Sequence, residues 1–61
     1  MNWEEAWGAL LAGGKVRIEG KPAYITLDMD GIWEHHMGGA VTYIGDVNPD
    51  LKNSDEWEIV Q

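Results

Sequence analysis

Three of the four basic residues in this 61-residue chain, Lys15, Arg17 and Lys21, lie within seven positions of one another. The remainder is acidic, and 11 Asp and Glu residues against four Lys and Arg give a net charge of −7. Lys15 and Arg17 are two positions apart and therefore share one face of a strand. Because the guanidinium fork suits a phosphate, the cluster indicates a small anion site. The alternative is a solvated strand face whose bases pair with nearby acids such as Glu19.

Tyr24 follows on the next predicted strand and would share the outer face of the sheet with the basic cluster. Its ring is able to stack on a nucleobase. Phosphate-binding cations beside a stacking aromatic favour a nucleotide as the ligand. A small anion would be admitted, whereas a long polyanion or an anionic membrane would meet the negative field of the rest of the chain. We therefore expect neither direct nucleic-acid binding nor membrane binding.

Chemistry beyond binding finds little support in the residue types. His35 and His36 are adjacent on a strand, so their rings point to opposite faces and do not chelate one ion. The absence of cysteine removes thiolate zinc sites and disulfides. Ser54 is the only serine, and it lies in a polar loop without a nucleophile motif. We expect no catalysis, no metal and no cofactor.

A helix is predicted at the N-terminus, where Trp3, Ala6, Trp7, Leu10 and Leu11 form one apolar stripe. Asn2 and Glu5 have the spacing of a capping box, and Gly13-Gly14 ends the helix. After these glycines the hydrophobic period changes from that of a helix to that of a strand. We assign Trp3, Leu10 and Trp57 to the core.

Alternating residues predict strands at 15–19, 23–28, 32–37, 40–44 and 55–60, with a loop or short helical turn at 45–54. A three-residue loop from Met29 to Gly31, with Gly31 left-handed, would pair Leu27 with Trp33. A two-residue Asp30-Gly31 loop would instead place charge in the core. The chosen register puts one set of side chains on the core face: Ile25, Leu27, Trp33 and Met37. One histidine would lie at the rim of the core and the other beside Tyr24. The fold class is α+β: a single domain, 1–61, with one N-terminal helix packed on a small antiparallel sheet of about five strands.

A chain of this length forms a thin core and usually depends on a disulfide, a metal or self-association. With disulfides excluded, we expect a homo-oligomer. The N-terminus lacks the positive start of a secretory signal, and no apolar run approaches the ~18 residues of a membrane span. These features predict a soluble cytosolic protein.

Two terminal segments carry a resemblance to a known family. The segments MNWEEAWGALLAGGKVRIEG and DEWEIV resemble the phage Thoeris anti-defence family of small sponge proteins, to which anti-CBASS sponges are related. The matching positions are Trp3, Ala6, Leu10, Gly14, Lys15, Val16 and Arg17, and then Trp57, Glu58, Ile59 and Val60. The family has a tryptophan shortly after the arginine, whereas here the first aromatic is Tyr24, and the middle of the chain is shorter than in typical members.

The resemblance implies a viral protein of the host cytoplasm that sequesters a cyclic nucleotide immune signal, of the cyclic dinucleotide or cyclic ADP-ribose type. It also implies a homotetramer, which we prefer over a dimer, with pockets between protomers. Lys15, Arg17 and Lys21 would hold the phosphates, while Tyr24, Trp7 or Trp33 would stack on the ligand. Two alternatives stay open: an acidic decoy that inhibits a nucleic-acid-binding effector such as a CRISPR nuclease, and an adaptor whose oligomer interface is its only function.

Overall fold

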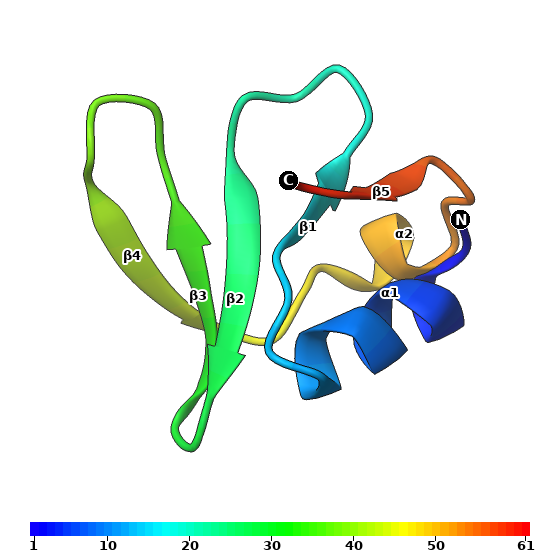
Figure 1. Cartoon of the computed structure of the whole chain (residues 1–61), viewed down its shortest axis with the longest axis horizontal. Helices are drawn as coiled ribbons and strands as arrows, with labels where there is room; N and C mark the ends of the chain where they lie inside the picture. The colour runs from blue at the N-terminus through cyan, green and yellow to red at the C-terminus, as the bar shows by residue number, and fades with distance from the viewer.

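One N-terminal helix lies against a five-stranded antiparallel sheet in the computed structural model, which covers residues 1–61 (Figure 1). This is the α+β fold that the sequence predicts. The strand order is β4-β3-β2-β1-β5. No helix in the chain is both long and apolar enough to traverse a bilayer. The elements in chain order are α1 (Trp3–Leu11), β1 (Val16–Ile18), β2 (Tyr24–Asp28), β3 (Gly31–His35), β4 (Val41–Gly45), α2 (Pro49–Lys52) and β5 (Trp57–Ile59).

Helix α1 begins and ends as the sequence predicts. The Asn2 side chain accepts a hydrogen bond from the Glu5 backbone N–H at 2.9 Å, and the Glu5 carboxylate accepts one from the Asn2 N–H at 3.1 Å. This is a complete capping box. After the helix, Gly13 has φ +89°, a conformation that side-chain-bearing residues rarely adopt. The apolar stripe then places Ala6 and Leu10 in the core.

The core lies between α1 and one face of the sheet, which we call the inner face. In Figure 1, β4, β3 and β2 run side by side, while β1 and β5 lie on the same side as the two helices. Trp3 packs on Trp57 with their ring centroids 5.0 Å apart, and the predicted core positions Leu10 and Trp57 are both buried. The seven buried residues are Ala6, Leu10, Val16, Ile25, Ile32, Val47 and Trp57.

Strands β1 and β2 share a single register pair, Val16 with Ile25, and diverge beyond it toward the turn that joins them (Figure 1). On its other side β1 is better paired, because Val16, Arg17 and Ile18 all lie opposite residues of β5. The sheet is therefore continuous near Val16 and open near the 19–23 turn. This opening determines where the candidate site lies.

The β2–β3 hairpin differs from the predicted register. The structure pairs Asp28 with Gly31 and Leu27 with Ile32, so the loop is the two residues Met29 and Asp30. The Asp28 carboxylate accepts the Asp30 N–H at 2.8 Å and closes the turn, while Gly31 has φ +131°. The predicted three-residue loop is wrong because this local hydrogen bond favours the tighter connection.

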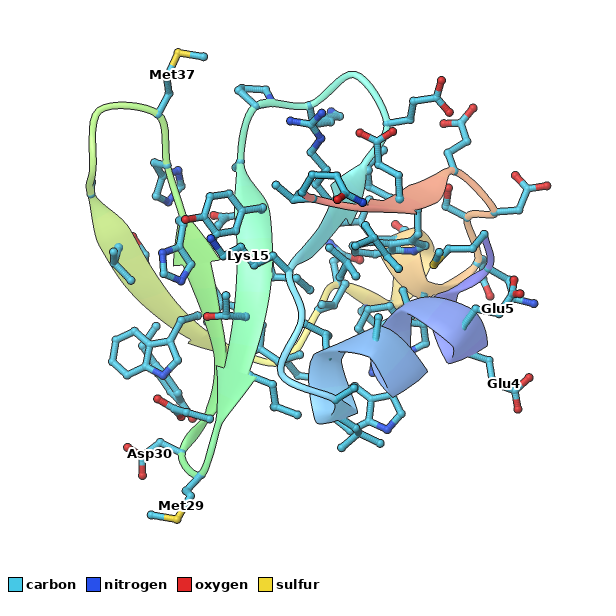
Figure 2. All side chains as sticks on the ribbon, in the orientation of Figure 1. Glu4, Glu5, Lys15, Met29, Asp30 and Met37 are labelled. Carbon is cyan, nitrogen blue, oxygen red and sulfur yellow. The ribbon has the colours of Figure 1, made fainter.

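The new register reverses the faces that the sequence assigned on β3. Trp33 lies opposite Thr26 on the outer face instead of beside Leu27, and Ile32 takes the core position. Met37 is not inward either: β3 ends at His35, and Met37 projects into solvent from the following turn, at the opposite end of the sheet from Met29 (Figure 2).

The predicted loop or short helical turn at 45–54 contains the four-residue helix α2. Asn48 caps it by accepting the Asp50 N–H at 2.9 Å. The indole N–H of Trp57 donates to the Leu51 carbonyl at 3.0 Å and fastens α2 to β5. The segment after β4 is thereby held beside the inner face of the sheet.

Candidate ligand-binding site

A cavity of about 430 Å³ opens on the inner face, beside the region that α1 covers. It lies where β1 and β2 diverge and is bounded by β3, the end of β4 and α2. Its volume is in the range of small-molecule pockets, about 300–1,000 Å³. Its apolar wall consists of Ile18, Ala23, Ile25, Ile44, Val47, Leu51 and Trp57, and its polar residues are Arg17, Lys21, Glu34, Asp46 and Asn48.

Two of the three predicted phosphate ligands border this cavity. Arg17 lies on β1 at the point of divergence, and Lys21 lies in the turn that follows. Arg17 donates through Nε to Oε2 of Glu58 at 2.6 Å, which leaves the two terminal guanidinium nitrogens without a protein partner. Lys21 forms no ion pair. Both residues therefore retain donors for an anion.

The two acids of the cavity differ in how fully they are engaged. Asp46 accepts from Lys52 Nζ at 2.9 Å and from the Val47 N–H at 2.8 Å. These hydrogen bonds, that of Lys52 first, hold the pKa of Asp46 below its usual value. Glu34 has one contact, from His36 Nε2 to its Oε1 at 3.2 Å. Glu34 is consequently the acid with acceptor capacity to spare.

The outer face of the sheet carries other predicted site residues, already in contact with one another. Tyr24 stacks on His35 with their centroids 4.7 Å apart and their planes at 5°. Lys15 Nζ lies 5.3 Å from the centre of the same ring, and in Figure 2 its side chain extends across the sheet. His35 also contacts Thr26, with 2.8 Å between Nε2 and Oγ1. The prediction of one histidine beside Tyr24 is confirmed.

Trp33 lies farther along the outer face. Its ring meets Tyr43 at 66°, with 5.0 Å between centroids, and the Tyr43 hydroxyl donates to the Asp30 carbonyl at 2.7 Å. The Trp33 indole nitrogen is buried without a hydrogen-bond partner. Trp33 is thus fixed by Tyr43 and lies on the opposite face of the sheet from the cavity.

The six predicted binding residues therefore occupy three places. Arg17 and Lys21 border the cavity, and Lys15, Tyr24 and Trp33 lie on the outer face. Arg17 alternates on β1 with the inward Val16 and Ile18, so it shares the face of Lys15 and meets the cavity at the gap between β1 and β2. Trp7 lies on α1, where its ring is 5.9 Å from that of Trp3. The single chain does not bring these six side chains together in one site.

Sequence reasoning missed Glu34 and the apolar wall of the cavity. The signal for Glu34 is its alternation with Ile32, which puts both on one face once the hairpin register is known. No group of three or more His, Asp or Glu side chains is placed to hold a metal ion. Comparison with models of known families, with curated proteins and with solved structures finds no match to this chain.

Proposed function

We propose that the protein binds a cyclic nucleotide in the inner-face cavity and sequesters it without chemistry. The observation that carries the proposal is the position of Arg17 and Lys21 at the border of a mainly apolar cavity. A ligand with an anionic end and a flat, weakly polar body matches that distribution. The resemblance of the two terminal segments to the phage sponge family supports the same assignment, with the host cytoplasm as the place of action.

The ligand would be held by complementary parts of the cavity. The terminal guanidinium nitrogens of Arg17 and the Lys21 ammonium would donate to phosphate oxygens, each a charge-assisted hydrogen bond of about 1.5–3 kcal/mol. The base would pack on apolar side chains such as Ile44 and Trp57, which border the same cavity. Sequestration requires affinity and abundance only, so no nucleophile or acid–base pair is needed.

The cavity lies toward the small end of ligand pockets and suits one nucleotide unit. A cyclic dinucleotide would extend out of it toward a second protomer. We infer that copies of the chain associate through β4, an edge strand with four consecutive exposed residues, Val41 to Ile44, and no charge. An unpaired, uncharged edge readily accepts another strand.

Antiparallel pairing of two β4 strands about Thr42 would be compatible with the charge of the chain. Val41 of one copy would lie opposite Tyr43 of the other, and both are half exposed in the single chain. Asp46 would lie beside Gly38 of the second copy instead of beside a second carboxylate. A dimer formed in this way retains its other edge, β5, so further association into the expected tetramer would use a different surface.

The acidic decoy is kept as a second candidate because of the unpaired acids. Asp46 and Glu58 form ion pairs with Lys52 and Arg17, and Glu34 contacts His36, which leaves eight of the 11 acids without a basic partner. Glu4, one of these eight, points away from α1 into solvent (Figure 2), and Glu5 is exposed although its carboxylate accepts the Asn2 N–H. Such a surface would compete with nucleic acid for a basic groove.

One experiment separates the two candidates. The protein is incubated with a panel of cyclic mononucleotides, cyclic dinucleotides and cyclic ADP-ribose isomers, and each mixture is measured by native mass spectrometry. A bound nucleotide that is lost in Arg17→Ala supports sequestration, and the same spectra report the number of subunits. If the whole panel leaves the protein unliganded while it displaces DNA from a nuclease, the decoy replaces the sponge.

A further inference from the structure

Glu34 occupies a position where the fold would ordinarily place an apolar residue. It lies directly opposite Ile25 across the β2–β3 pair, on the same face as Ile32, and both isoleucines are buried. A carboxylate on the core face of a strand costs free energy unless it is solvated or paired. Glu34 avoids that cost because α1 does not cover this part of the inner face. The side chain of Glu34 borders the open cavity instead.

The remaining contacts of Glu34 leave one carboxylate oxygen free. Oε1 is 3.2 Å from His36 Nε2, whereas Oε2 has no protein partner and the side chain is about one-third exposed, at 36%. Asp46, the other acid of the cavity, is already engaged by Lys52 and by the Val47 N–H. An ionised carboxylate only accepts hydrogen bonds. The cavity therefore offers acceptor oxygens on β3 and cationic donors at Arg17 and Lys21.

This division restricts the ligand that the cavity would take. The part of the ligand that meets Glu34 must donate, and a nucleobase with two adjacent donors matches the two oxygens of a carboxylate best. Guanine presents N1–H and the N2 amino group side by side. Adenine presents one amino group beside N1, an acceptor that would face a carboxylate lone pair. A buried acceptor left opposite another acceptor is strongly disfavoured.

We propose that the base recognised in the cavity is guanine, with Glu34 as the residue that selects it. The inference rests on the proposed nucleotide-binding function and names the class of nucleotide. Arg17 and Lys21 receive the phosphate, Glu34 accepts from N1–H and N2–H, and the apolar wall packs on the faces of the base. His36 acts through Glu34 by holding Oε1, so it is a positioning residue.

The test compares 3′,5′-cyclic GMP with 3′,5′-cyclic AMP by titration calorimetry. The parent should bind cyclic GMP at least about tenfold more tightly, the equivalent of one well-formed hydrogen bond to a charged group. Glu34→Gln is nearly isosteric but places an amide N–H₂ where an oxygen stood, and it should reduce the preference to below about threefold, with cyclic AMP binding retained. Glu56→Gln, which makes the same charge change outside the cavity, should leave the preference unchanged.

The possible outcomes distinguish failure of guanine recognition from failure of the proposed nucleotide binding. If both nucleotides bind the parent equally, or cyclic AMP binds more tightly, guanine recognition is overturned while nucleotide binding stands. If Glu34→Gln still prefers cyclic GMP, Glu34 is not the residue that selects guanine. If neither nucleotide binds the parent and the wider panel also fails, the proposed function is overturned, and this inference with it. Thermal unfolding of each variant confirms that a lost preference is not a lost fold.

Discussion

Arg17 and Glu58 face each other across the β1–β5 pair, with 2.6 Å between Nε and Oε2 although 41 residues separate them in the chain. Both side chains are about one-third exposed, so the pair contributes below about 1 kcal/mol to folding. Its larger effect is on orientation. Holding Nε on Glu58 leaves the other two guanidinium nitrogens without a protein partner, so both would be available to the proposed phosphate.

Arg17→Ala should weaken binding of the nucleotide identified in the panel by about tenfold to a hundredfold, the equivalent of about 1.5–3 kcal/mol. Arg17→Lys should recover only part of this, because an ammonium does not present the same fork. Titration calorimetry measures both variants. Unaltered affinity in Arg17→Ala would assign the phosphate to Lys21. If substitutions at Lys15, Arg17 and Lys21 all leave the affinity unchanged, the cluster is a solvated strand face.

Glu58→Gln tests whether the carboxylate orients Arg17 or competes with the ligand for it. If orientation dominates, affinity should fall by about threefold to tenfold, since one charged hydrogen bond that fixes the guanidinium is weakened. The midpoint of thermal unfolding should change little. A gain in affinity would show that Glu58 is a competitor, and Glu19→Gln, a charge change at an exposed acid without an ion pair, is the matched control.

Gly31→Ala should destabilise the fold by roughly 1 kcal/mol or more. Gly31 has φ +131°, and an added Cβ would lie 3.0 Å from both the Gly45 carbonyl oxygen and the Tyr43 hydroxyl. Gly20→Ala is the control, because Gly20 also has a positive φ, +83°, with nothing within 4 Å of a new Cβ. The difference between the urea unfolding midpoints of the two variants gives the part of the destabilisation that comes from the steric contacts of the new Cβ. The β3–β4 pair has an irregular register between Ile32 and Trp33, and equal destabilisation would mean that this bulge adjusts to the methyl group.

The hydrogen bonds of Asp46 predict a local dependence on pH. The Lys52 ammonium and the Val47 N–H lower the pKa of this carboxyl below its unfolded value. The stabilisation is therefore fully present above the unfolded pKa and is lost as the pH falls through the lowered folded pKa. NMR titration should place the Asp46 midpoint below the ordinary value for an aspartate, and Lys52→Met should raise it. A midpoint that stays low in Lys52→Met would assign the shift to the backbone donor alone.

The edge strand β4 supplies the prediction on assembly. Sedimentation equilibrium at micromolar concentration should show a dimer or larger species, and Val41→Lys should shift it toward the monomer, because each lysine charge would then lie opposite Tyr43 of the other copy within the paired edge. Glu4→Lys, which adds a lysine at an exposed position of α1 without an ion pair, should leave assembly unchanged. A parent that sediments only as the 6.8 kDa chain would refute self-association.

The elements near the chain ends could be predicted because local rules decide them. The Asn2–Glu5 capping box, the stripe through Ala6 and Leu10 and the following glycines all act within one helix. Trp57, the only tryptophan in the last quarter of the chain, was assigned to the core on its alternation and is buried. These features can be predicted without knowing the order of the strands in the sheet.

The register of β3 could not be predicted from the rule that charged side chains stay off the core face. That rule holds only where the whole inner face is buried in the core. Here α1 covers only part of it, so Glu34 is tolerated opposite Ile25, and Trp33 moves to the outer face beside Tyr43. The cavity itself follows from the divergence of β1 and β2, and no short-range pattern encodes that divergence.

The position of β5 beside β1 has a consequence for the folding rate. Hairpins β2–β3 and β3–β4 close over short loops, but the buried Trp57 reaches its place only when a loop of about 40 residues is closed. Such long-range pairing slows folding relative to the hairpins and is the step that completes the core. Trp57→Phe should therefore raise the unfolding rate much more than it lowers the refolding rate, and the refolding arm of a chevron plot should report mainly on the three-stranded meander.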